Sequence, residues 1–218
     1  MIQDDVAYKK YPHHHKWFNK LYIAELFGYK CGPAGVDIPE DGTYVIRPIY
    51  NLSGMGMGAK VMELKEGDES STPPGYFWCE YLKGKHFSAN YKWKVDNIIG
   101  GWWEGVSCWE GINLPINLSR FTQWNRSEYI PLIHRSFFSQ LNELYDVKEI
   151  NVEWKDNKII EIHLRPSPDP NWDIIIPIWT SDTYDKREHY KSCGFEYIES
   201  YDDADGHLED PRLGFMVK

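Results

Sequence analysis

The segment Asn151-Val-Glu-Trp-Lys-Asp-Asn-Lys-Ile-Ile-Glu-Ile-His-Leu-Arg-Pro166 contains two runs of residues around a polar turn. Side chains along a β-strand point alternately to the two faces of the sheet. Glu161, His163 and Arg165 therefore share one face of the second run, and apolar side chains occupy the other face. The segment predicts a β-hairpin with one polar and one apolar face.

The register of this hairpin follows from the same pattern. A two-residue turn at 156–157 would place Glu161 opposite Val152 and mix charged with apolar groups on both faces. A three-residue turn that includes Lys158 places Glu153 opposite Glu161 instead. Because a one-residue slip would turn the apolar set to water, we predict this second register. It gathers an uninterrupted apolar face of Val152, Trp154, Ile160, Ile162 and Leu164.

Glu153 and Glu161 would then be neighbouring carboxylates, with Arg165 close by on the same face. Like charges directly across a strand pair repel each other, and a bound divalent cation is the usual compensation. Two solvated surface glutamates remain the alternative interpretation of the same pattern.

Composition limits the classes of protein to which the chain can belong. With 218 residues, 42% of them apolar and 10 Trp, it can form one large domain or two lobes around a sizeable core. The net charge of −9 argues against broad binding of nucleic acid or anionic membranes, although a local basic cleft stays possible. No apolar run approaches the roughly 18 residues of a membrane span, and the start does not resemble a signal peptide. The four cysteines form no CxxC pair, so we expect free thiols and a cytoplasmic protein.

The sequence patterns in the rest of the chain predict a mixture of helices and strands, typical of the α+β class. A helical pattern ends at Gly28, and we interpret the preceding His13, His14 and His15 as a polar loop rather than a metal site, because consecutive histidines cannot all face one ion. Further helices are expected at 129–145 and 184–193, and turns at 31–35 and 39–42. The expected strands are 44–50, 59–64, 76–82, 85–93 and 174–179, followed by a final pair near Phe195 and Phe215.

A glycine loop separates the first two of these strands. Gly54, Gly56 and Gly58 allow backbone N–H groups to converge on an anion. A Rossmann loop would open a helix, whereas a strand pattern follows here, and the Gly-Lys-Ser/Thr of a Walker loop is missing. The remaining interpretation is a loop between two antiparallel strands that closes over phosphate groups. Arg47, on the strand that enters the loop, supplies a cation for the phosphate oxygens.

A protein-kinase interpretation fits less well. The third strand carries Glu80 where a kinase needs a lysine. The nearest string to the kinase catalytic loop, His134-Arg-Ser136, lacks the aspartate, and Leu141 stands where that loop needs an asparagine.

The ordered series Val45-Ile-Arg-Pro48, glycine loop, Phe77-Trp-Cys-Glu-Tyr-Leu82, Gly84-Lys-His-Phe-Ser88 and Glu153…Glu161-Ile-His163 resembles the ATP-grasp family. The resemblance covers about residues 43–166 and implies an α+β fold with two lobes of antiparallel sheet and helices around a nucleotide cleft. It divides the chain into a helical extension (1–42), a glycine-loop lobe (43–82) and a larger lobe (83–218). The compactness of the chain is similar to that of phage-encoded ATP-grasp proteins.

The resemblance also implies roles for residues, with ATP and Mg²⁺ as cofactors. Glu153 and Glu161 would hold the metal, and Arg47 would contact the phosphates. His163 stands where the family has asparagine; as a poorer Mg²⁺ ligand it suits orienting substrate or accepting Mn²⁺. The remaining nucleotide-binding residues would be Ser53, Gly54, Met55, Gly56, Met57 and Gly58 of the loop, Glu80, Tyr81 and Leu82 of the hinge, and His86.

Two features depart from the family pattern. Arg47 replaces a lysine, and only about forty residues precede the first strand, which leaves no room for the family's separate N-terminal domain. The family often places an arginine before the metal motif to neutralise an acyl-phosphate. Arg120, Arg126 and Arg135 precede the hairpin here, whereas Arg165 shares the face of Glu161, so we expect Arg165, Arg126 and His163 to be catalytic.

The expected activity is ATP-dependent ligation of a small-molecule carboxylate to an amine, through an acyl-phosphate. Phosphoryl transfer needs positioning and charge stabilisation more than a protein nucleophile. A phosphotransferase on the same fold is the alternative enzyme, and a non-catalytic nucleotide-binding module is the third possibility.

Overall fold

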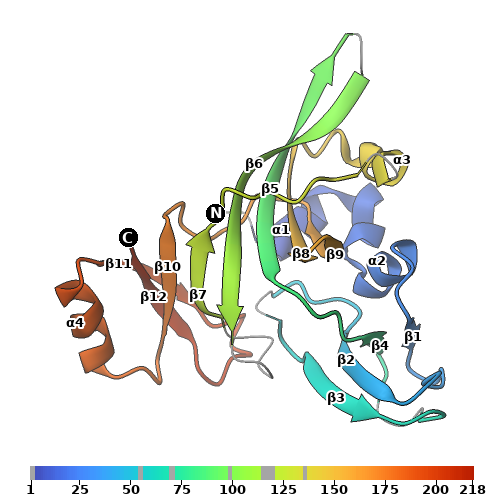
Figure 1. The fold of residues 1–218 in the computed structure, drawn as a ribbon, viewed down its shortest axis with the longest axis horizontal. Helices are drawn as coiled ribbons and strands as arrows, with labels where there is room; N and C mark the ends of the chain where they lie inside the picture. Colours follow the sequence, from blue (N-terminus) through green and yellow to red (C-terminus); the bar gives the residue numbers. More distant parts are fainter. Residues whose placement is uncertain (1–2, 54–55, 69–71, 98–99, 114–120, 135–136) are drawn as a thin grey trace.

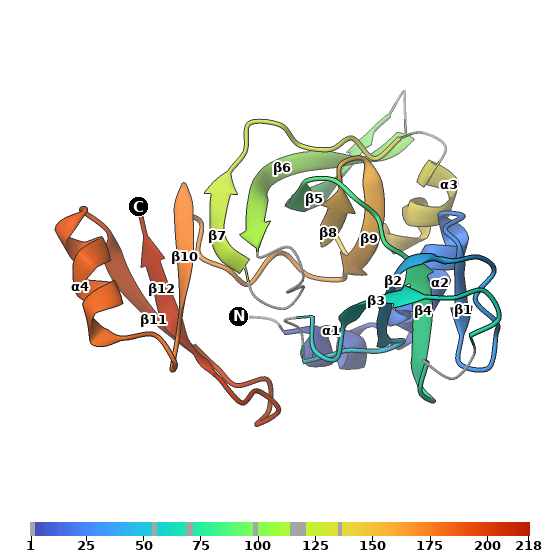
Figure 2. The ribbon, with the colours of Figure 1, turned by 60° about the horizontal axis from the view of Figure 1, so that its bottom comes forward.

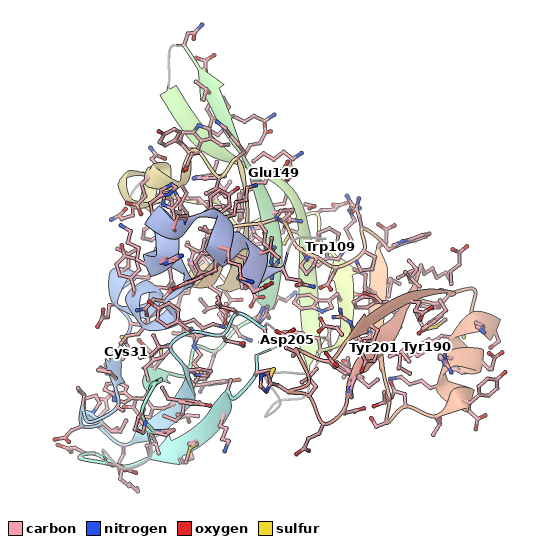
Figure 3. All side chains as sticks on the ribbon, turned by 180° about the vertical axis from the view of Figure 1, so that it is seen from behind. Cys31, Trp109, Glu149, Tyr190, Tyr201 and Asp205 are labelled. Carbon is pink, nitrogen blue, oxygen red and sulfur yellow. The ribbon has the colours of Figure 1, made fainter. Side chains whose placement is uncertain are left out.

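The computed structural model describes residues 3–53, 56–68, 72–97, 100–113, 121–134 and 137–218. In this part of the chain the strands form two antiparallel sheets, one of four strands and one of eight. The smaller sheet lies beside β8 and β9 of the larger one, on the side of the molecule away from α4 (Figures 1 and 2). Cys31 and Tyr190 accordingly lie toward opposite ends of the molecule, with Trp109 and Asp205 between them (Figure 3).

The four-stranded sheet has the order β1-β4-β2-β3. Its strands are β1 (Cys31–Pro33), β2 (Gly42–Pro48), β3 (Lys60–Leu64) and β4 (Tyr76–Glu80). One face packs around Ile38, Tyr44 and Trp78, and the other places Phe77 and Cys79 against Ala24 of a helix. Burial alternates along β2, as expected for a strand with one buried face, whereas the central residues of β4 are buried on both faces.

The eight-stranded sheet has the order β11-β12-β10-β7-β6-β5-β8-β9. Two long strands, β5 (His86–Asp96) and β6 (Gly100–Asn113), form the hairpin that extends upward in Figure 1. The others are β7 (Phe121–Arg126), β8 (Glu149–Lys155), β9 (Lys158–His163), β10 (Ile174–Trp179), β11 (Glu196–Asp202) and β12 (Arg212–Val217).

Most helices cover one face of this larger sheet. α1 (Asp4–Lys10), the 3₁₀ helix η1 (Pro12–Phe18) and α2 (Lys20–Leu26) contribute Ala7, Trp17 and Ile23 to the core that β5, β8 and β9 form. α2 also contacts the smaller sheet, so the N-terminal helices connect the two sheets. The remaining helices are α3 (Phe138–Leu141), the 3₁₀ helix η3 (Asn142–Leu144) and α4 (Tyr184–Ser192).

The glutamate hairpin has the predicted register but a different turn. Glu153 lies opposite Glu161, and Val152 lies opposite Ile162. The turn nevertheless has two residues, 156–157, and a β-bulge between Glu153 and Trp154 restores the register. Because a bulge adds one residue to one strand, Ile159 enters the core and Ile160 points to the cleft, contrary to the prediction for Ile160.

Other predictions have mixed outcomes. The expected strands correspond to β2–β5 and β10–β12, and the helix before Gly194 corresponds to α4. The helix predicted over 129–145 is correct only in its last part, where α3 and η3 lie; residues 129–134 are not helical, and Pro131 disfavours helical backbone before it. The cluster at 31–35, predicted as a turn, contains β1.

The four cysteines, all of them among the described residues, are free, and Cys193 is exposed. In the described ranges, every helix is too short or too polar to cross a membrane.

Candidate active site

A cleft between the two sheets brings together side chains from both ends of the chain. Of the residues predicted from sequence, it is lined by Arg47, Ser53, Gly56, Met57, Glu80, Tyr81, Leu82, His86, Glu153, Glu161, His163 and Arg165. Gly54 and Met55 lie outside the described residues. Gly58 is not among the described residues that line the cleft, but its positive φ of +72° and the Tyr76 hydroxyl 2.8 Å from where a Cβ would sit both favour glycine.

The carboxylate hairpin forms the centre of the cleft. Ligand atoms of Glu153, Glu161 and His163 all lie within 4.8 Å of one another. His163 Nε2 is 3.5 Å from Glu153 Oε1 and 3.7 Å from Glu161 Oε2. Two carboxylates and an imidazole at this spacing are a donor set that fits a divalent cation.

Two cations reach Glu161 from other elements. Arg47 Nη1 on β2 lies 2.8 Å from Glu161 Oε1, and Arg47 Nη2 donates to the carbonyl oxygen of Ile160 at 3.1 Å. Lys20 Nζ, at the start of α2, lies 2.6 Å from Glu161 Oε2. Lys20 was not predicted from the sequence, although its spacing of three and four residues from the buried Ile23 and Ala24 places it on the inner face of that helix.

Glu153 lies between two histidines. His86 Nε2 is 3.3 Å from its Oε2, and His163 approaches its Oε1. Burial alone would raise the pKa of Glu153, but the adjacent imidazoles of His163 and His86 hold the pKa well below its ordinary value. Glu153 is therefore ionised at neutral pH. His86 itself packs edge-on against Phe121 and Trp124.

An aspartate from α1 supports the other side of His163. Asp4 Oδ2 lies 3.0 Å from His163 Nδ1 and 2.8 Å from Arg165 Nη2. Burial opposes ionisation of Asp4, yet His163 and Arg165 lower its pKa to about 2. Burial also disfavours the charged imidazole, but Asp4 and Glu153 raise the pKa of His163 to about 9. Asp4 was missed because it is 159 residues from His163, and no local pattern marks it.

The lining of the cleft contains a second set of charges. Arg212 Nη2 lies 3.3 Å from Asp202 Oδ2, and Arg212 Nη1 lies 3.9 Å from Asp169 Oδ1. The guanidinium lies 4.4 Å from the centre of the Phe215 ring. Burial raises the pKa of Asp169. These residues were also missed, since they come from loops and strands after the hairpin.

Arg126 is not among the described residues that line the cleft. Its Nη1 donates to Asn171 Oδ1 at 3.1 Å, and the guanidinium lies over Trp109. Alternation along β7 places Arg126 on the same face as Trp124, which lines the cleft, but Arg126 is the last residue of that strand and lies in ion-pair range of Asp173. Arg120 and Arg135 lie outside the described residues.

The N-terminal histidines form a separate cluster. They lie on η1 rather than in a loop, so that expectation was wrong. His13 Nε2 lies 2.9 Å from Asp146 Oδ2, and His14 Nε2 lies 2.8 Å from Asp146 Oδ1. His15 Nε2 bonds to the carbonyl oxygen of Tyr8, whose ring stacks on it. Asp146, which lies far away in the sequence, joins the histidines to the turn before β8.

The fold is similar to those of solved structures, although the sequence matches no known family. No model of a known protein family and no curated protein matches the sequence. Among solved structures, N5-carboxyaminoimidazole synthetase from Staphylococcus aureus, complexed with ADP, is similar with a TM-score of 0.51 and 10% identity, over 92% of this chain and 66% of that one. A protein described as a member of the ATP-grasp superfamily from Archaeoglobus fulgidus has a TM-score of 0.48 and 12% identity, over 94% of this chain and 65% of that one.

An L-amino acid ligase from Bacillus licheniformis has a TM-score of 0.44 and 13% identity, over 69% of this chain and 41% of that one. The chain thus spans about two thirds or less of the length of these structures. It has the α+β ATP-grasp fold, as the sequence resemblance predicted.

Proposed function

We propose that this chain binds ATP with a divalent cation in the cleft and joins a carboxylate to an amine through an acyl-phosphate. One observation carries the proposal. Arg47, next to the glycine loop on the smaller sheet, meets Glu161 of the paired carboxylates on the larger sheet across 114 residues of sequence. A phosphate-binding cation and a metal-binding pair thus face the same space.

The triphosphate would lie along this line of contact. Arg47 and Lys20 would exchange part of their pairing with Glu161 for phosphate oxygens, to which charge-assisted hydrogen bonds are strong. Ser53, Gly56 and Met57 would cover the phosphates from the glycine-loop lobe, residues 43–82. Lys20 and Asp4 come from the N-terminal extension, residues 1–42, which therefore forms part of the site.

The base would bind at the hinge between this lobe and the larger lobe, residues 83–218. The N–H of Glu80 already donates to the carbonyl of Lys30, and that of Tyr81 to the carbonyl of Thr43. The N–H groups of Glu80 and Tyr81 are therefore already used, and adenine would be bound by backbone carbonyl groups of the hinge and by Leu82. Ala24 and Cys79 provide apolar contacts for the ring.

Glu153 and Glu161 fit the divalent cation that this fold uses with ATP. Their side chains are adjacent, Glu153 stays ionised, and the cleft is open to them. A bound cation would neutralise charge on the β- and γ-phosphates as the γ-phosphoryl group is transferred.

The acceptors would bind in the part of the cleft lined by Arg165, Asp169 and Arg212. A carboxylate oxygen attacks the γ-phosphorus, and ADP leaves. The amine then attacks the acyl carbon, inorganic phosphate leaves, and the amine loses a proton. Asp169, whose pKa is raised by burial, is the group in this part of the cleft that we assign as the proton acceptor. Arg165 and Arg212 would hold the carboxylate and then the acyl-phosphate.

A turnover screen tests the proposal. Purified protein with ATP and Mg²⁺ or Mn²⁺ is given carboxylates and amines singly and in pairs, and products are identified by mass spectrometry. Ligation predicts that phosphate release depends on both acceptors and yields an amide. A stable phosphoester formed from one acceptor would identify a phosphotransferase. Tight ATP binding without turnover over a broad set would indicate a binding module. Arg126→Met, outside the cleft, serves as the matched control for variants of Arg165 and Arg212.

A further inference from the structure

We propose that His163 is a third ligand of the metal through Nε2, held in place by Asp4, and that the site therefore favours Mn²⁺ over Mg²⁺. This inference rests on the proposed metal site between Glu153 and Glu161. It adds a nitrogen ligand, a positioning residue and a preferred ion to that site.

The distances suit a single ion. His163 Nε2 lies 3.5 Å from one glutamate and 3.7 Å from the other. An ion about 2.1 Å from each atom, a usual length for such bonds, would subtend angles of roughly 110–125° between the nitrogen and each oxygen. Nε2 can therefore bind an ion shared with Glu153 and Glu161 after small side-chain movements.

The other ring nitrogen is already committed. Nδ1 lies 3.0 Å from Asp4 Oδ2, and Asp4 is only 3% exposed. Arg165 donates to the same oxygen at 2.8 Å and so fixes the carboxylate. A histidine that binds a metal through one nitrogen usually donates the N–H of the other to a carboxylate, which sets its tautomer and ring orientation. Asp4, His163 and the two glutamates have this arrangement.

The preference for an ion follows from the chemistry of the ligands. Mg²⁺ prefers oxygen ligands and near-octahedral geometry, whereas imidazole suits transition metals. Replacing one oxygen ligand by a nitrogen should weaken Mg²⁺ binding more than Mn²⁺ binding. The competing interpretation is that His163 is only a charged link between Asp4 and Glu153, with no role as a ligand.

Electron paramagnetic resonance of bound Mn²⁺ separates the two interpretations. The full chain is loaded with Mn²⁺ and a non-hydrolysable ATP analogue, and electron spin echo modulation is recorded. A ¹⁴N coupling from a directly bound imidazole is expected. Mn²⁺ bound without any ¹⁴N coupling would overturn the inference, and this result does not depend on the folding of a variant.

Variants assign the nitrogen. His163→Asn should remove the coupling and lower the ratio of Mn²⁺ to Mg²⁺ affinity at least about tenfold, because an amide oxygen replaces the imidazole. His86→Asn, at the other histidine near Glu153, should keep the coupling. Asp4→Asn should keep the coupling but weaken Mn²⁺ binding about 10- to 100-fold, as is usual for carboxylates that support a ligand. A coupling that survives in His163→Asn would refute the assignment.

Failure of the inference can be told apart from failure of the proposed function. Mn²⁺ held by Glu153 and Glu161 without nitrogen would contradict the role of His163 and leave the ATP-dependent reaction standing. Mn²⁺ and Mg²⁺ affinities that are unchanged in Glu153→Gln and Glu161→Gln would show that no metal binds at the hairpin, and both proposals would fall.

Discussion

Among the described residues, two groups of histidines and carboxylates lie close enough to hold a metal, and their surroundings are opposite in character. The cleft cluster is Glu153, Glu161 and His163. The surface clamp is His13, His14 and Asp146. Each brings its ligand atoms within 4.8 Å of one another. Donor atoms at metal-binding distances therefore do not by themselves distinguish a site from a structural contact.

The surroundings make the distinction. In the surface clamp, each oxygen of one carboxylate meets one histidine, and the contact joins η1 to the turn before β8. In the cleft cluster, two carboxylates share two histidines, an arginine and a lysine, beside a cavity that both sheets line. The surface clamp is satisfied by its own partners. In the cleft cluster, the cationic side chains can bind a phosphate group and the carboxylates can bind a metal ion.

The largest expected effect is that of Glu161→Gln. Turnover should fall by about two or more orders of magnitude, because the metal would no longer be held against the reacting phosphates. Nucleotide affinity should change much less, since Arg47 and Lys20 lose a competing carboxylate and stay available to phosphate. Steady-state kinetics and calorimetry with an ATP analogue measure the two quantities.

Asp146→Asn is the matched control, because it removes one carboxylate charge from the surface clamp. It should leave turnover unchanged. Wild-type turnover in Glu161→Gln, or lost turnover in a well-folded Asp146→Asn, would reverse the roles that we give to the two clusters.

Arg47→Met should have the next largest effect. It removes a charge-assisted contact to phosphate, and such hydrogen bonds contribute about 1.5–3 kcal/mol, so nucleotide affinity should fall roughly 10- to 100-fold. Calorimetry with the ATP analogue measures it. Unchanged affinity would mean that Arg47 only neutralises Glu161.

Arg212→Met should have a smaller effect, confined to the acceptor. We expect the KM for the carboxylate to rise about tenfold, the loss of roughly one charged hydrogen bond. The KM for ATP should stay the same. Arg126→Met should change neither constant, because Arg126 contacts Asn171 and Trp109 outside the cleft. Equal effects of the two variants would place the acceptor elsewhere.

How much of the fold and of the candidate site could be predicted from the sequence depended on how far apart in sequence the contacting residues are. The pairing of Glu153 with Glu161 follows from alternation within sixteen residues, because a slip would expose a whole apolar face. The turn was wrong although the register was right, since a bulge and a longer turn give the same pairing. The prediction of one helix over 129–145 failed in its first part because it relied on the spacing of apolar residues and neglected Pro131.

The partners that complete the site were beyond such reasoning. Lys20 and Asp4 reach Glu161 and His163 only because the N-terminal helices pack on β9. The same holds for the contact of His13 and His14 with Asp146, which lies more than 130 residues from them in sequence. Local patterns predicted most of the strands and the carboxylate pair, although not β1 or β7, whereas the tertiary packing decided which charges meet.

The smallest expected effect concerns the stability of the surface clamp. Burial opposes ionisation of Asp146, but hydrogen bonds from His14 and His13 lower its pKa in the folded protein. A carboxyl group with a lowered folded pKa stabilises the fold above its unfolded pKa, about 4, and this contribution is lost as the pH falls through the folded pKa. Because Asp146 is about one-third exposed, Asp146→Asn should cost less than about 1 kcal/mol at pH 7.

Denaturant unfolding of the wild type and Asp146→Asn between pH 7 and pH 3 measures this contribution. The difference in the free energy of unfolding should shrink below about pH 4, because the wild-type carboxyl then becomes neutral as well. Adding Zn²⁺ or Mn²⁺ at pH 7 should not widen the difference, since the clamp is satisfied by its own hydrogen bonds. A metal-dependent rise in wild-type stability that Asp146→Asn abolishes would show that the surface clamp is a metal site too, and the distinction between the two clusters would then be lost.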